Sequence, residues 1–423
     1  MTIIEVLQER GFIEALTSED IAKVTLQPVK VYCGFDPTAD SLHLGNLVAI
    51  MGLAWFQRYG HTPVALIGGA TGMIGDPSGK SADRQLLDVE TIEHNLKGIR
   101  KNLEAILDFN HPSARPIIVN NFDWFKDFTL IEFLRQVGKF FRLGPMLAKD
   151  SVKARLQSEE GMSFTEFCYQ TLQGYDFLHL FETQDILIQL GGSDQWGNIV
   201  AGTDLIRKVL SQQAYGVTFP LLTKNDGQKF GKSEKGAIWL SPEKLSSYEF
   251  YQYLVRVEDA DVIKLMRMLT FMELSEIHEY KKRMEEPDYI PRTAQKRLAE
   301  EITRLVHGEA GLEKAIRVTE GVAPGSNTSL DADMLESLAS DMPNCTLQRS
   351  DLKNKKVIDL LVETGLQTSK GEARRLIKNG GVSINNDKIN DEGCQIEEKH
   401  FISDRLMLLA AGKKNKMLIK LEN

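Results

Sequence analysis

A group of polar residues after the first β-rich run of the chain contains the donor types that phosphate chemistry needs. It includes His43, Gly45 and Asn46, and Ser41 is a plausible N-cap that would place His43 and Asn46 in the first turns of a helix. A helix N-terminus offers free N–H groups and a partial positive charge to phosphate, and a glycine lets a nucleotide base approach the backbone. The ordinary alternative is a capped helix with a satisfied histidine.

Two lysines spaced three residues apart form a second group with the same preference. Lys229 and Lys232 flank Gly231 in the polar loop 223–235, which follows the last β-rich run. Such a pair on a mobile loop suits a clamp on a polyphosphate whose charge grows in the transition state. Taken alone, this spacing is typical of a solvated turn.

In this order and strand context, the two motifs closely resemble the HIGH and KMSKS pair of class I aminoacyl-tRNA synthetases. Two positions depart from the family pattern, because Asn46 stands where the first motif ends in His and Gly231 is the third residue of the second motif. We expect Asn46 to keep its role, since an amide can still donate a hydrogen bond. Gly231 could loosen the clamp loop.

Four further segments resemble the loops of a bacterial-type tyrosyl-tRNA synthetase. They are 32–38, 72–80, 163–176 and 191–198. Within the third, Tyr169, Gln173 and Asp176 are spaced i, i+4 and i+7 and should share one stripe of a helix. A polar surface stripe is the alternative, but the apolar residues beside it need burial on a neighbouring face. The resemblance covers nearly the whole chain, from about Val31 onward.

The resemblance implies an enzyme that activates L-tyrosine with ATP to tyrosyl-adenylate and pyrophosphate, and then transfers tyrosine to the 3′ end of tRNA(Tyr). The implied tyrosine site comprises Tyr32 and Asp176 at the substrate hydroxyl, Asp76, Tyr169 and Gln173 at the ammonium group, and Gln195 at the carboxylate. The implied ATP-binding residues are Asp36, His43, Gly45, Asn46, Gly192, Asp194 and Lys232. The implied catalytic residues are Thr38, His43, Asn46, Lys80, Arg84, Lys229 and Lys232. Mg²⁺ should accompany ATP, and no carboxylate cluster suggests a dedicated metal site.

The end of the chain differs in charge from the rest. Residues 351–423 hold 14 Lys and Arg against 11 Asp and Glu, a net charge of +3, while the remainder has a net charge of −11. A basic appendage favours a polyanionic partner, although a solvated surface is an equal alternative on charge alone. From Leu352 the tail resembles a small RNA-binding domain also found in a small-subunit ribosomal protein and in pseudouridine synthases. Its candidate phosphate contacts are Lys370, Arg374, Arg375 and Lys378.

Short β-rich runs alternate with helical patterns in the first half of the chain. They lie at 29–33, 64–67, 117–119 and 186–190. This alternation predicts βαβ units with a parallel sheet, and therefore an α/β fold. Ligands on such sheets bind beyond the carboxyl ends of the strands. We therefore expect the site in the segments that follow the runs, which are 34–46, 68–80, 121–124 and 191–198.

Four parts are predicted along the chain. A Rossmann-like catalytic domain spans 1–218 with inserted helices at about 129–164, and a helical domain with the lysine loop spans 219–318. A Gly/Pro/Ser-rich stretch within 319–350 indicates a flexible linker. An α+β RNA-binding domain completes the chain at 351–423.

Oligomeric state and location can also be predicted. The inserted helices carry Phe133, Phe140, Phe141 and Phe164, which favours a homodimer surface because the resembled family is homodimeric; an internal core is the alternative. No apolar run is long enough to span a bilayer, and the N-terminus lacks the features of a signal or transit peptide, so we expect a cytoplasmic protein without a membrane partner. A processed organellar form is the alternative. The four cysteines are too dispersed for a disulfide framework or a zinc site.

Three other functions are weighed against this interpretation. The sister tryptophanyl enzyme is disfavoured by the Tyr32 and Asp176 pair and by the basic tail. A noncatalytic RNA-binding protein built on a synthetase scaffold is disfavoured by the intact His43, Lys229 and Lys232. A dinucleotide oxidoreductase is weaker still, because the first strand–helix turn lacks a GxGxxG fingerprint.

Overall fold

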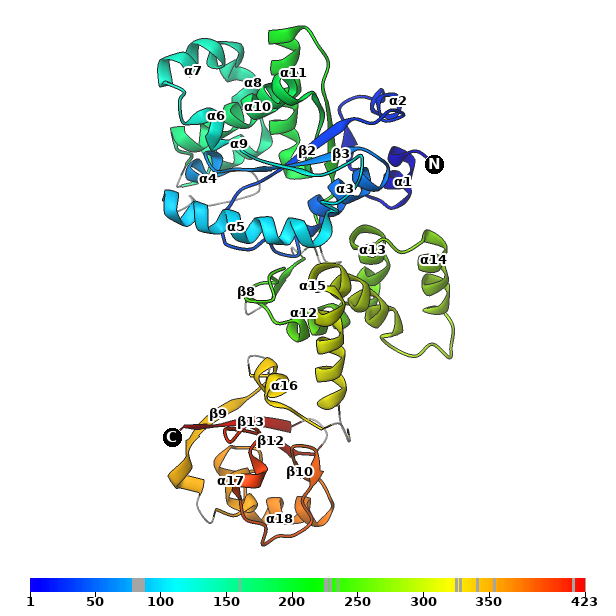
Figure 1. Cartoon of the computed structure of the whole chain (residues 1–423), viewed down its shortest axis with the longest axis vertical. Coiled ribbons are helices and arrows are strands. Elements are labelled where there is room, and N and C mark those ends of the chain that lie inside the picture. Colours follow the sequence, from blue (N-terminus) through cyan, green and yellow to red (C-terminus); the bar gives the residue numbers. More distant parts are fainter. Residues whose placement is uncertain are drawn as a thin grey trace. The chain divides into compact units, whose positions relative to one another are not determined.

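The computed structural model forms two compact units (Figure 1). The first comprises Met1–Lys244 with Val257–Val306, and the second comprises Leu245–Arg256 with His307–Asn423. The residues described are 1–77, 88–159, 161–223, 227, 230–233, 236–323, 326, 329–339, 342–352, 355–412 and 415–422. Within these ranges, no helix is both long enough and apolar enough to cross a membrane.

A six-stranded sheet forms the centre of the first unit, in the order β1-β6-β5-β2-β3-β4. Its strands are β1 (Ala15–Leu16), β2 (Lys30–Phe35), β3 (Thr62–Ile67), β4 (Ile117–Asn120), β5 (Ile186–Gly192) and β6 (Tyr215–Phe219). All neighbours are parallel except β1, which runs antiparallel to β6. The predicted α/β fold with a parallel sheet is confirmed, and β1 and β6 extend it beyond the four predicted runs.

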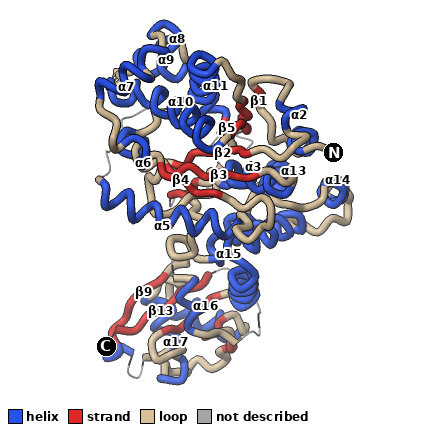
Figure 2. Tube along the Cα trace, turned by 45° about the horizontal axis from the view of Figure 1, so that its top comes forward, coloured by secondary structure: helices blue, strands red, loops and turns tan. Residues whose placement is uncertain are grey.

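Helices cover both faces of this sheet (Figure 2). α3 (Leu47–Arg58) packs on β2, β3 and β5, while α10 (Phe164–Gln184) and α11 (Trp196–Leu210) pack on β5 from the other side. Successive side chains of a strand point to opposite faces, so a strand covered on both sides is apolar at most positions. This is why Val31, Tyr32 and Cys33 are all buried in β2.

The order of the strands creates a crevice beside β2. From β2 the chain runs outward through β3 to β4, and later adds β5 and β6 on the other side of β2. Such a reversal in an open parallel sheet leaves a binding crevice outside the carboxyl ends of the two strands where it occurs, here β2 and β5. The segments 34–46 and 191–198 leave the sheet at this point.

The other helices of the first unit lie before the first strand, on the connections between strands or after the sheet. They are α1 (Ile3–Glu9), α2 (Ile21–Val24), α4 (Thr71–Ile74), α5 (Val89–Ile106), α6 (Phe122–Phe125), α7 (Leu130–Gln136), η1 (Gly138–Phe140), α8 (Leu143–Leu147), α9 (Asp150–Leu156), η2 (Ser193–Gln195), α13 (Asp259–Leu269) and α14 (Leu274–Arg283). β7 (Lys232–Ser233) and β8 (Gly236–Ala237) form a small hairpin. The predicted insertion at 129–164 is therefore a chain of short helices, α7 to α9, that ends where α10 begins.

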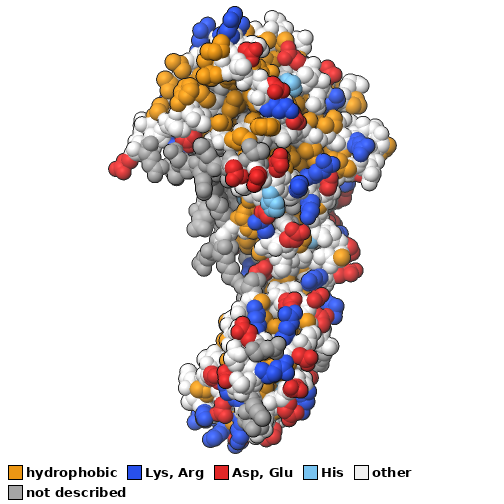
Figure 3. Space-filling model, turned by 60° about the vertical axis from the view of Figure 1, so that its left-hand side comes forward, with side chains coloured by type: hydrophobic (Ala, Val, Ile, Leu, Met, Phe, Trp, Pro, Cys, Tyr) orange, Lys and Arg blue, Asp and Glu red, His pale blue; other side chains and the backbone are white. Residues whose placement is uncertain are grey.

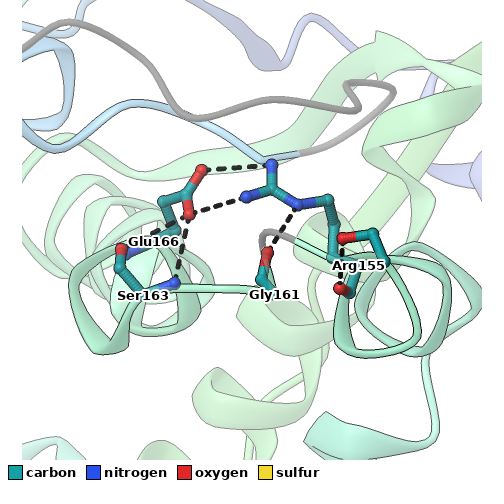
Figure 4. Close-up of polar contacts among 5 residues, drawn as sticks. Arg155, Gly161, Ser163 and Glu166 are labelled. Atoms are coloured by element: carbon teal, nitrogen blue, oxygen red, sulfur yellow. Dashed lines mark hydrogen bonds and ion pairs between the residues drawn. The ribbon is translucent and has the colours of Figure 1, made fainter.

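A buried ion pair fixes the start of α10 (Figure 4). Ser163 is the N-cap, and its hydroxyl accepts a hydrogen bond from the Glu166 N–H at 3.2 Å. The Glu166 carboxylate accepts the Ser163 N–H at 3.3 Å and meets Arg155 Nη2 at 3.1 Å, while Arg155 Nε donates to the Gly161 carbonyl at 3.0 Å. Removing one partner would leave a charge buried and uncompensated. The pair therefore ties α9 to the first turn of α10.

One long helical element belongs to both units. α15 (Thr293–Gly321) contains Gly308 with φ 72° and ψ 178°, a conformation that is essentially restricted to glycine, and the helix is kinked there. α13 and α14 belong to the first unit, whereas α12 (Ser247–Val255) and the end of α15 belong to the second. The predicted helical domain 219–318 therefore does not form a separate unit.

The second unit is built on a five-stranded sheet in the order β11-β10-β12-β13-β9. Its strands are β11 (Asp387–Lys388), β10 (Val382–Ile384), β12 (Leu406–Ala411), β13 (Asn415–Glu422) and β9 (Asn344–Gln348), and its further elements are α16 (Ala332–Ser337), η3 (Arg349–Leu352), α17 (Val357–Glu363), α18 (Lys370–Lys378) and η4 (Glu398–His400). β9 pairs in parallel with β13. It lies inside the predicted linker 319–350, so the sheet of the tail begins before residue 351.

Both faces of the tail sheet are covered. Met407 and Leu409 of β12 pack in a cluster with α17 and α18, while Leu406 and Leu408 pack with Met334 of α16 and with Val318 of α15. The predicted linker therefore contains a helix that contributes to a core. This apolar cluster joins the tail sheet to the end of α15.

Gly98 of α5 allows that helix to lie against the segment that precedes His43. A Cβ atom at Gly98 would lie 1.8 Å from the Asp40 carbonyl oxygen and 2.6 Å from the carbonyl carbon. Overpacking against backbone forces the chain to shift, so we expect Gly98→Ala to lower the free energy of unfolding by roughly 1–3 kcal/mol. Gly144→Ala in α8 is the control, because its Cβ would meet nothing within 4 Å. Chemical denaturation measures both variants, and equal stabilities would contradict this close contact.

Candidate active site

A cavity of about 480 Å³ opens at the carboxyl ends of β2 and β5, where the strand order predicts a crevice. All of its described lining belongs to the first unit. The lining includes the candidate residues Tyr32, Asp36, Thr38, His43, Gly45, Asn46, Asp76, Tyr169, Gln173, Asp176, Gly192, Asp194 and Gln195. The fold thus brings together candidate residues from four separate segments of the sequence.

Tyr32 and Asp176 are two nearly fully buried polar residues of the cavity lining. Asp176 is 2% exposed, and its carboxylate accepts hydrogen bonds from Trp124 Nε1 at 2.9 Å and Asn121 Nδ2 at 3.1 Å. Burial raises the pKa of Asp176 to about 7, and the two hydrogen bonds only partly offset this. The Tyr32 hydroxyl is also buried, and it has no hydrogen-bond partner among the described residues. A buried hydroxyl and a buried carboxyl group that line the same cavity suit one small polar group of a ligand.

Asp36 is hydrogen-bonded to a residue of the predicted tyrosine-binding stripe. Tyr169 donates its hydroxyl to Asp36 Oδ2 at 2.8 Å, and Thr71 donates to Asp36 Oδ1 at 2.9 Å. Tyr169, Gln173 and Asp176 all lie on α10 and line the cavity, as expected from their spacing. Asp36, which the sequence assigns to ATP, thus lies at the carboxyl end of β2 within hydrogen-bonding distance of Tyr169.

A chain of amides links the two sides of the cavity. Gln195 Nε2 donates to Asp76 Oδ2 at 2.7 Å, and it lies 3.3 Å from Asp194 Oδ2. Asn198 Nδ2 donates to Gln173 Oε1 at 3.0 Å and is 3.3 Å from Gln195 Oε1. The first turn of α11 is thereby connected to α10. Two predicted ammonium ligands, Asp76 and Gln173, are held in fixed orientations by this network.

The expectation that His43 and Asn46 lie inside a helix capped by Ser41 is wrong. α3 begins at Leu47, and Asn46 occupies its N-cap position. The Ser41 hydroxyl is engaged elsewhere, because it donates to the Leu42 carbonyl at 2.7 Å and accepts the Ser241 N–H at 3.1 Å. Residues 43–46 instead form a turn in which Asn46 Oδ1 accepts the His43 N–H at 3.1 Å.

Gly45 has a local steric role in that turn. Its N–H donates to His43 Nδ1 at 3.1 Å, and a Cβ atom on Gly45 would lie 2.9 Å from the imidazole ring. The absence of a side chain therefore lets the imidazole lie over the backbone. His43 also forms a β-bridge with Trp239, which joins the turn to the segment after β8.

Several candidate residues fall outside what the structure describes. Lys80, Arg84 and Lys229 lie outside the described residues, as does the side chain of Lys232. The backbone of Lys232 lies in β7, and Phe230 lines the cavity. The clamp role of the lysines accordingly stays a prediction.

Comparison with known proteins identifies the family. The model of "tRNA synthetases class I (W and Y)" matches residues 25–322, and that of the "Tyrosine--tRNA ligase SYY-like C-terminal domain" matches residues 334–419. The chain is 75% identical over 419 residues to the tyrosine–tRNA ligase of Protochlamydia amoebophila, covering 99% of both proteins. The chain belongs to the tyrosine–tRNA ligases.

Solved structures agree with this membership. A C-terminally truncated mitochondrial tyrosyl-tRNA synthetase from Coccidioides posadasii superposes with a TM-score of 0.65 at 36% identity, covering 74% of this chain and 91% of that one. A tryptophanyl-tRNA synthetase from Encephalitozoon cuniculi superposes with a TM-score of 0.54 at 12% identity, covering 73% of this chain and 87% of that one. The second likeness shows the fold alone. The shared fold therefore does not separate the two ligase families, whereas the sequence does.

Sequence reasoning assigned no role to four residues that hold this ligase's site together. Thr71, Asn121, Trp124 and Asn198 donate hydrogen bonds to assigned residues. Their segments were expected to matter because they follow strand ends. Lys149 carried no such signal: its Nζ donates to the Gly197 carbonyl at 2.7 Å, and burial lowers its pKa to about 8 despite the opposing charge of Asp76.

The candidate RNA-binding residues of the ligase lie on α18 in the second unit. Lys370 pairs with Asp359 at 2.7 Å, and Lys378 pairs with Glu392 at 3.0 Å. Arg374 lies 4.0 Å from the same Glu392, and Arg375 is exposed. The predicted basic face is present, but carboxylates of the same unit lie within ion-pair distance of three of its four cations.

The raised pKa of Asp176 should make the stability of the first unit fall with pH. The folded protein keeps this proton up to about pH 7, whereas an unfolded aspartate releases it near about pH 3.9. Between these values the folded state binds more protons, so stability decreases as pH rises. We expect the Tm of Asp176→Asn, relative to the wild-type protein, to increase from about pH 4 to about pH 7. Thermal unfolding at a series of pH values measures this, and a constant difference would contradict it.

Proposed function

We propose that this chain attaches L-tyrosine to tRNA(Tyr) in two steps. The observation that carries the substrate assignment is the buried Tyr32 hydroxyl, which has no hydrogen-bond partner among the described residues. Burial raises the pKa of Tyr32 well above its usual value, and the charge of the nearby Asp176 raises it further. An unsatisfied buried hydroxyl costs free energy, which a ligand group can recover. A phenolic hydroxyl can accept from Tyr32 while it donates to Asp176. The indole N–H of tryptophan can only donate, and so could satisfy one of the two.

In the first step, the tyrosine carboxylate attacks the α-phosphorus of ATP, an acyl–phosphate bond forms, and pyrophosphate leaves. The protein would contribute positioning rather than covalent chemistry. Asp76, Tyr169 and Gln173 would hold the ammonium group, and Gln195 the carboxylate. Because Tyr169 donates its proton to Asp36, its oxygen stays available to accept from the ammonium group.

The phosphates would be held from the opposite end of the cavity. Thr38, His43, Lys80, Arg84, Lys229 and Lys232 would meet the charge that develops on pyrophosphate, and Asp36, Gly45, Asn46, Gly192 and Asp194 would hold the nucleotide. Among the described residues no group of three His, Cys, Asp or Glu side chains could hold a metal ion. Mg²⁺ would therefore take its main ligands from the ATP phosphates and water, as this ion commonly does.

In the second step, a hydroxyl of the 3′-terminal ribose of the tRNA attacks the adenylate carbonyl, and AMP leaves. The tail would bind the tRNA through phosphate contacts of Lys370, Arg374, Arg375 and Lys378 on α18. Its net charge of +3, against −11 for the remainder, would direct the polyanion toward it. We expect the reaction to take place in the cytoplasm.

ATP–pyrophosphate exchange tests the proposed activity directly. Exchange should depend on tyrosine and should not be supported by tryptophan. Exchange with tryptophan would favour the sister enzyme. No exchange with any amino acid would favour a noncatalytic RNA-binding protein on a synthetase scaffold.

Substitution of Tyr32 should separate specificity from stability. Tyr32→Phe removes one neutral hydrogen bond to the substrate, so we expect kcat/KM for tyrosine to fall about 2- to 12-fold and that for phenylalanine to stay unchanged. The free variant should be as stable as the wild-type protein or more so, because the hydroxyl has no partner among the described residues. Tyr169→Phe is the control, since it breaks the bond to Asp36 and should lower stability. If Tyr32→Phe leaves the ratio of kcat/KM for tyrosine to that for phenylalanine unchanged, the assignment of Tyr32 to the tyrosine site is wrong.

The inserted helices would form the surface of a homodimer. Leu130, Ile131, Leu143 and Phe164 are large apolar side chains that lie exposed on them and at the start of α10. Hydrophobic side chains gather on this part of the first unit (Figure 3). Exposed apolar patches of this kind mark interaction surfaces in soluble proteins. The other three predicted aromatics, Phe133, Phe140 and Phe141, pack partly buried against the core instead.

A charge in this patch should dissociate the dimer. We expect the wild-type protein to show twice the chain mass by light scattering at micromolar concentration, and Ile131→Glu to show a substantial monomer fraction, because a carboxylate would be buried at the interface. Leu26→Glu is the control, as Leu26 is 63% exposed on the loop after α2, away from the inserted helices. A monomeric wild-type protein would contradict this proposal.

A further inference from the structure

The basic face of α18 is accompanied by two carboxylates from outside the helix. Lys370, Arg374 and Lys378 follow one another at four-residue intervals, so they lie on one side of α18. Asp359 of α17 pairs with Lys370 at 2.7 Å. Glu392 comes from the connection between β11 and β12 and lies beside the other two cations.

The carboxylate of Glu392 lies near two cations, Arg374 and Lys378. Its Oε1 lies 3.0 Å from Lys378 Nζ and its Oε2 lies 4.0 Å from Arg374 Nε. The side chain of Glu392 is 34% exposed, whereas those of Arg374 and Lys378 are 59% and 68% exposed. The cations are thus open to solvent while the carboxylate is more enclosed. A phosphate can approach both cations from outside without first moving Glu392.

The backbone around Glu392 is anchored. Asp391 Oδ1 accepts the Gly393 N–H at 2.8 Å, and the Asp391 carbonyl accepts the Cys394 N–H at 3.2 Å. Ile396 lies in the core of the unit, and its N–H donates to the Lys355 carbonyl at 2.8 Å. The backbone that carries Glu392 is therefore held beside α18 by the fold, without help from the ion pairs.

We propose that Glu392 is a fixed competitor for RNA phosphate, which lowers the affinity of α18 for tRNA and its dependence on salt. This inference rests on the proposed function of the tail. Exposed ion pairs are weak, so phosphate can take over both cations. The enclosed Glu392 stays close after the exchange, and its negative charge continues to oppose the phosphates. The local charge available to the RNA is that of one cation rather than two.

Such a competitor suits an enzyme that must release a charged tRNA after each turnover. Each neutralised phosphate releases about 0.9 counterion from a duplex, so affinity rises steeply with the number of free cations. The negative charge of Glu392 offsets one of the positive charges on α18 whenever an RNA binds to this helix. Glu392 would therefore change the affinity for tRNA and the rate at which tRNA dissociates. It would not change the chemical steps in the first unit.

Glu392→Gln should strengthen tRNA binding in a salt-dependent manner. We expect the plot of log K against log salt concentration to steepen by roughly one unit, since one more phosphate is effectively neutralised. If the affinities of the two proteins converge near 1 M salt, the gain is about 5-fold at 0.15 M salt and about 15-fold at 0.05 M salt. Fluorescence anisotropy with labelled tRNA(Tyr) and the full chain measures both quantities. Tyrosine-dependent pyrophosphate exchange should not change.

Asp404→Asn provides the matched control. Asp404 belongs to the same unit, is exposed, and has no ion-pair partner among the described side chains. Its φ of 57° is one that asparagine tolerates well. Removing this charge should change tRNA affinity less than twofold. If Glu392→Gln and Asp404→Asn raise tRNA affinity equally, the net charge of the unit explains the effect and the inference is overturned.

A double variant separates failure of this inference from failure of the proposed function. Arg374→Gln with Lys378→Gln should weaken tRNA binding, because it removes both cations that would contact phosphate. If the double variant binds tRNA like the wild-type protein, α18 does not contact tRNA and the proposed role of the helix fails. If the double variant binds weakly while Glu392→Gln alone leaves affinity and slope unchanged, only the competitor role of Glu392 is overturned.

Discussion

A buried carboxyl group without a cation imposes a constraint on the whole first unit. No described cation pairs with Asp176, so its charged form depends on the amide of Asn121 and the indole of Trp124. Asn121 is held in turn, because its Oδ1 accepts the Ala70 N–H at 2.8 Å and its Nδ2 donates to Thr71 at 3.0 Å. The ends of β3 and β4 and the middle of α10 must therefore meet at one point. The parallel sheet provides that meeting, since the carboxyl ends of its strands share one edge.

The same helix connects this polar centre to the exterior of the unit. Phe164, the first residue of α10, is exposed, and Asp176 lies twelve residues further along, about 18 Å at the helical rise. The ion pair of Arg155 and Glu166 fixes the first turn between them. A surface proposed to bind a second chain and a site proposed to bind tyrosine thus belong to one rigid element. Any shift of α10 that accompanies dimer formation would move both.

The sequence predicted what depends on local pattern and missed what depends on distant partners. The buried strands and the stripe on α10 follow from apolar runs and helical spacing, and both are present. Ser41 was wrong as a cap because Ser241, 200 residues away, donates to its hydroxyl. β9 was hidden within a linker because its side chains are only exposed or half-buried, and because it pairs with β13 at the far end of the chain. Lys149 gave no signal, since only the fold carries it to Gly197.

The two units use charge in opposite ways, and each way suits its proposed task. In the first, Asp176 and Tyr32 are buried at the cavity, where an unpaired polar group is costly, so a ligand that lacks the matching hydroxyl would leave them unsatisfied. In the second, the cations of α18 are exposed and their ion pairs are weak. Exposed pairs exchange easily with phosphate but distinguish one phosphate poorly from another. The proposed discrimination among amino acids would therefore depend on buried groups, and the proposed reversible capture of a large polyanion would depend on exposed ones.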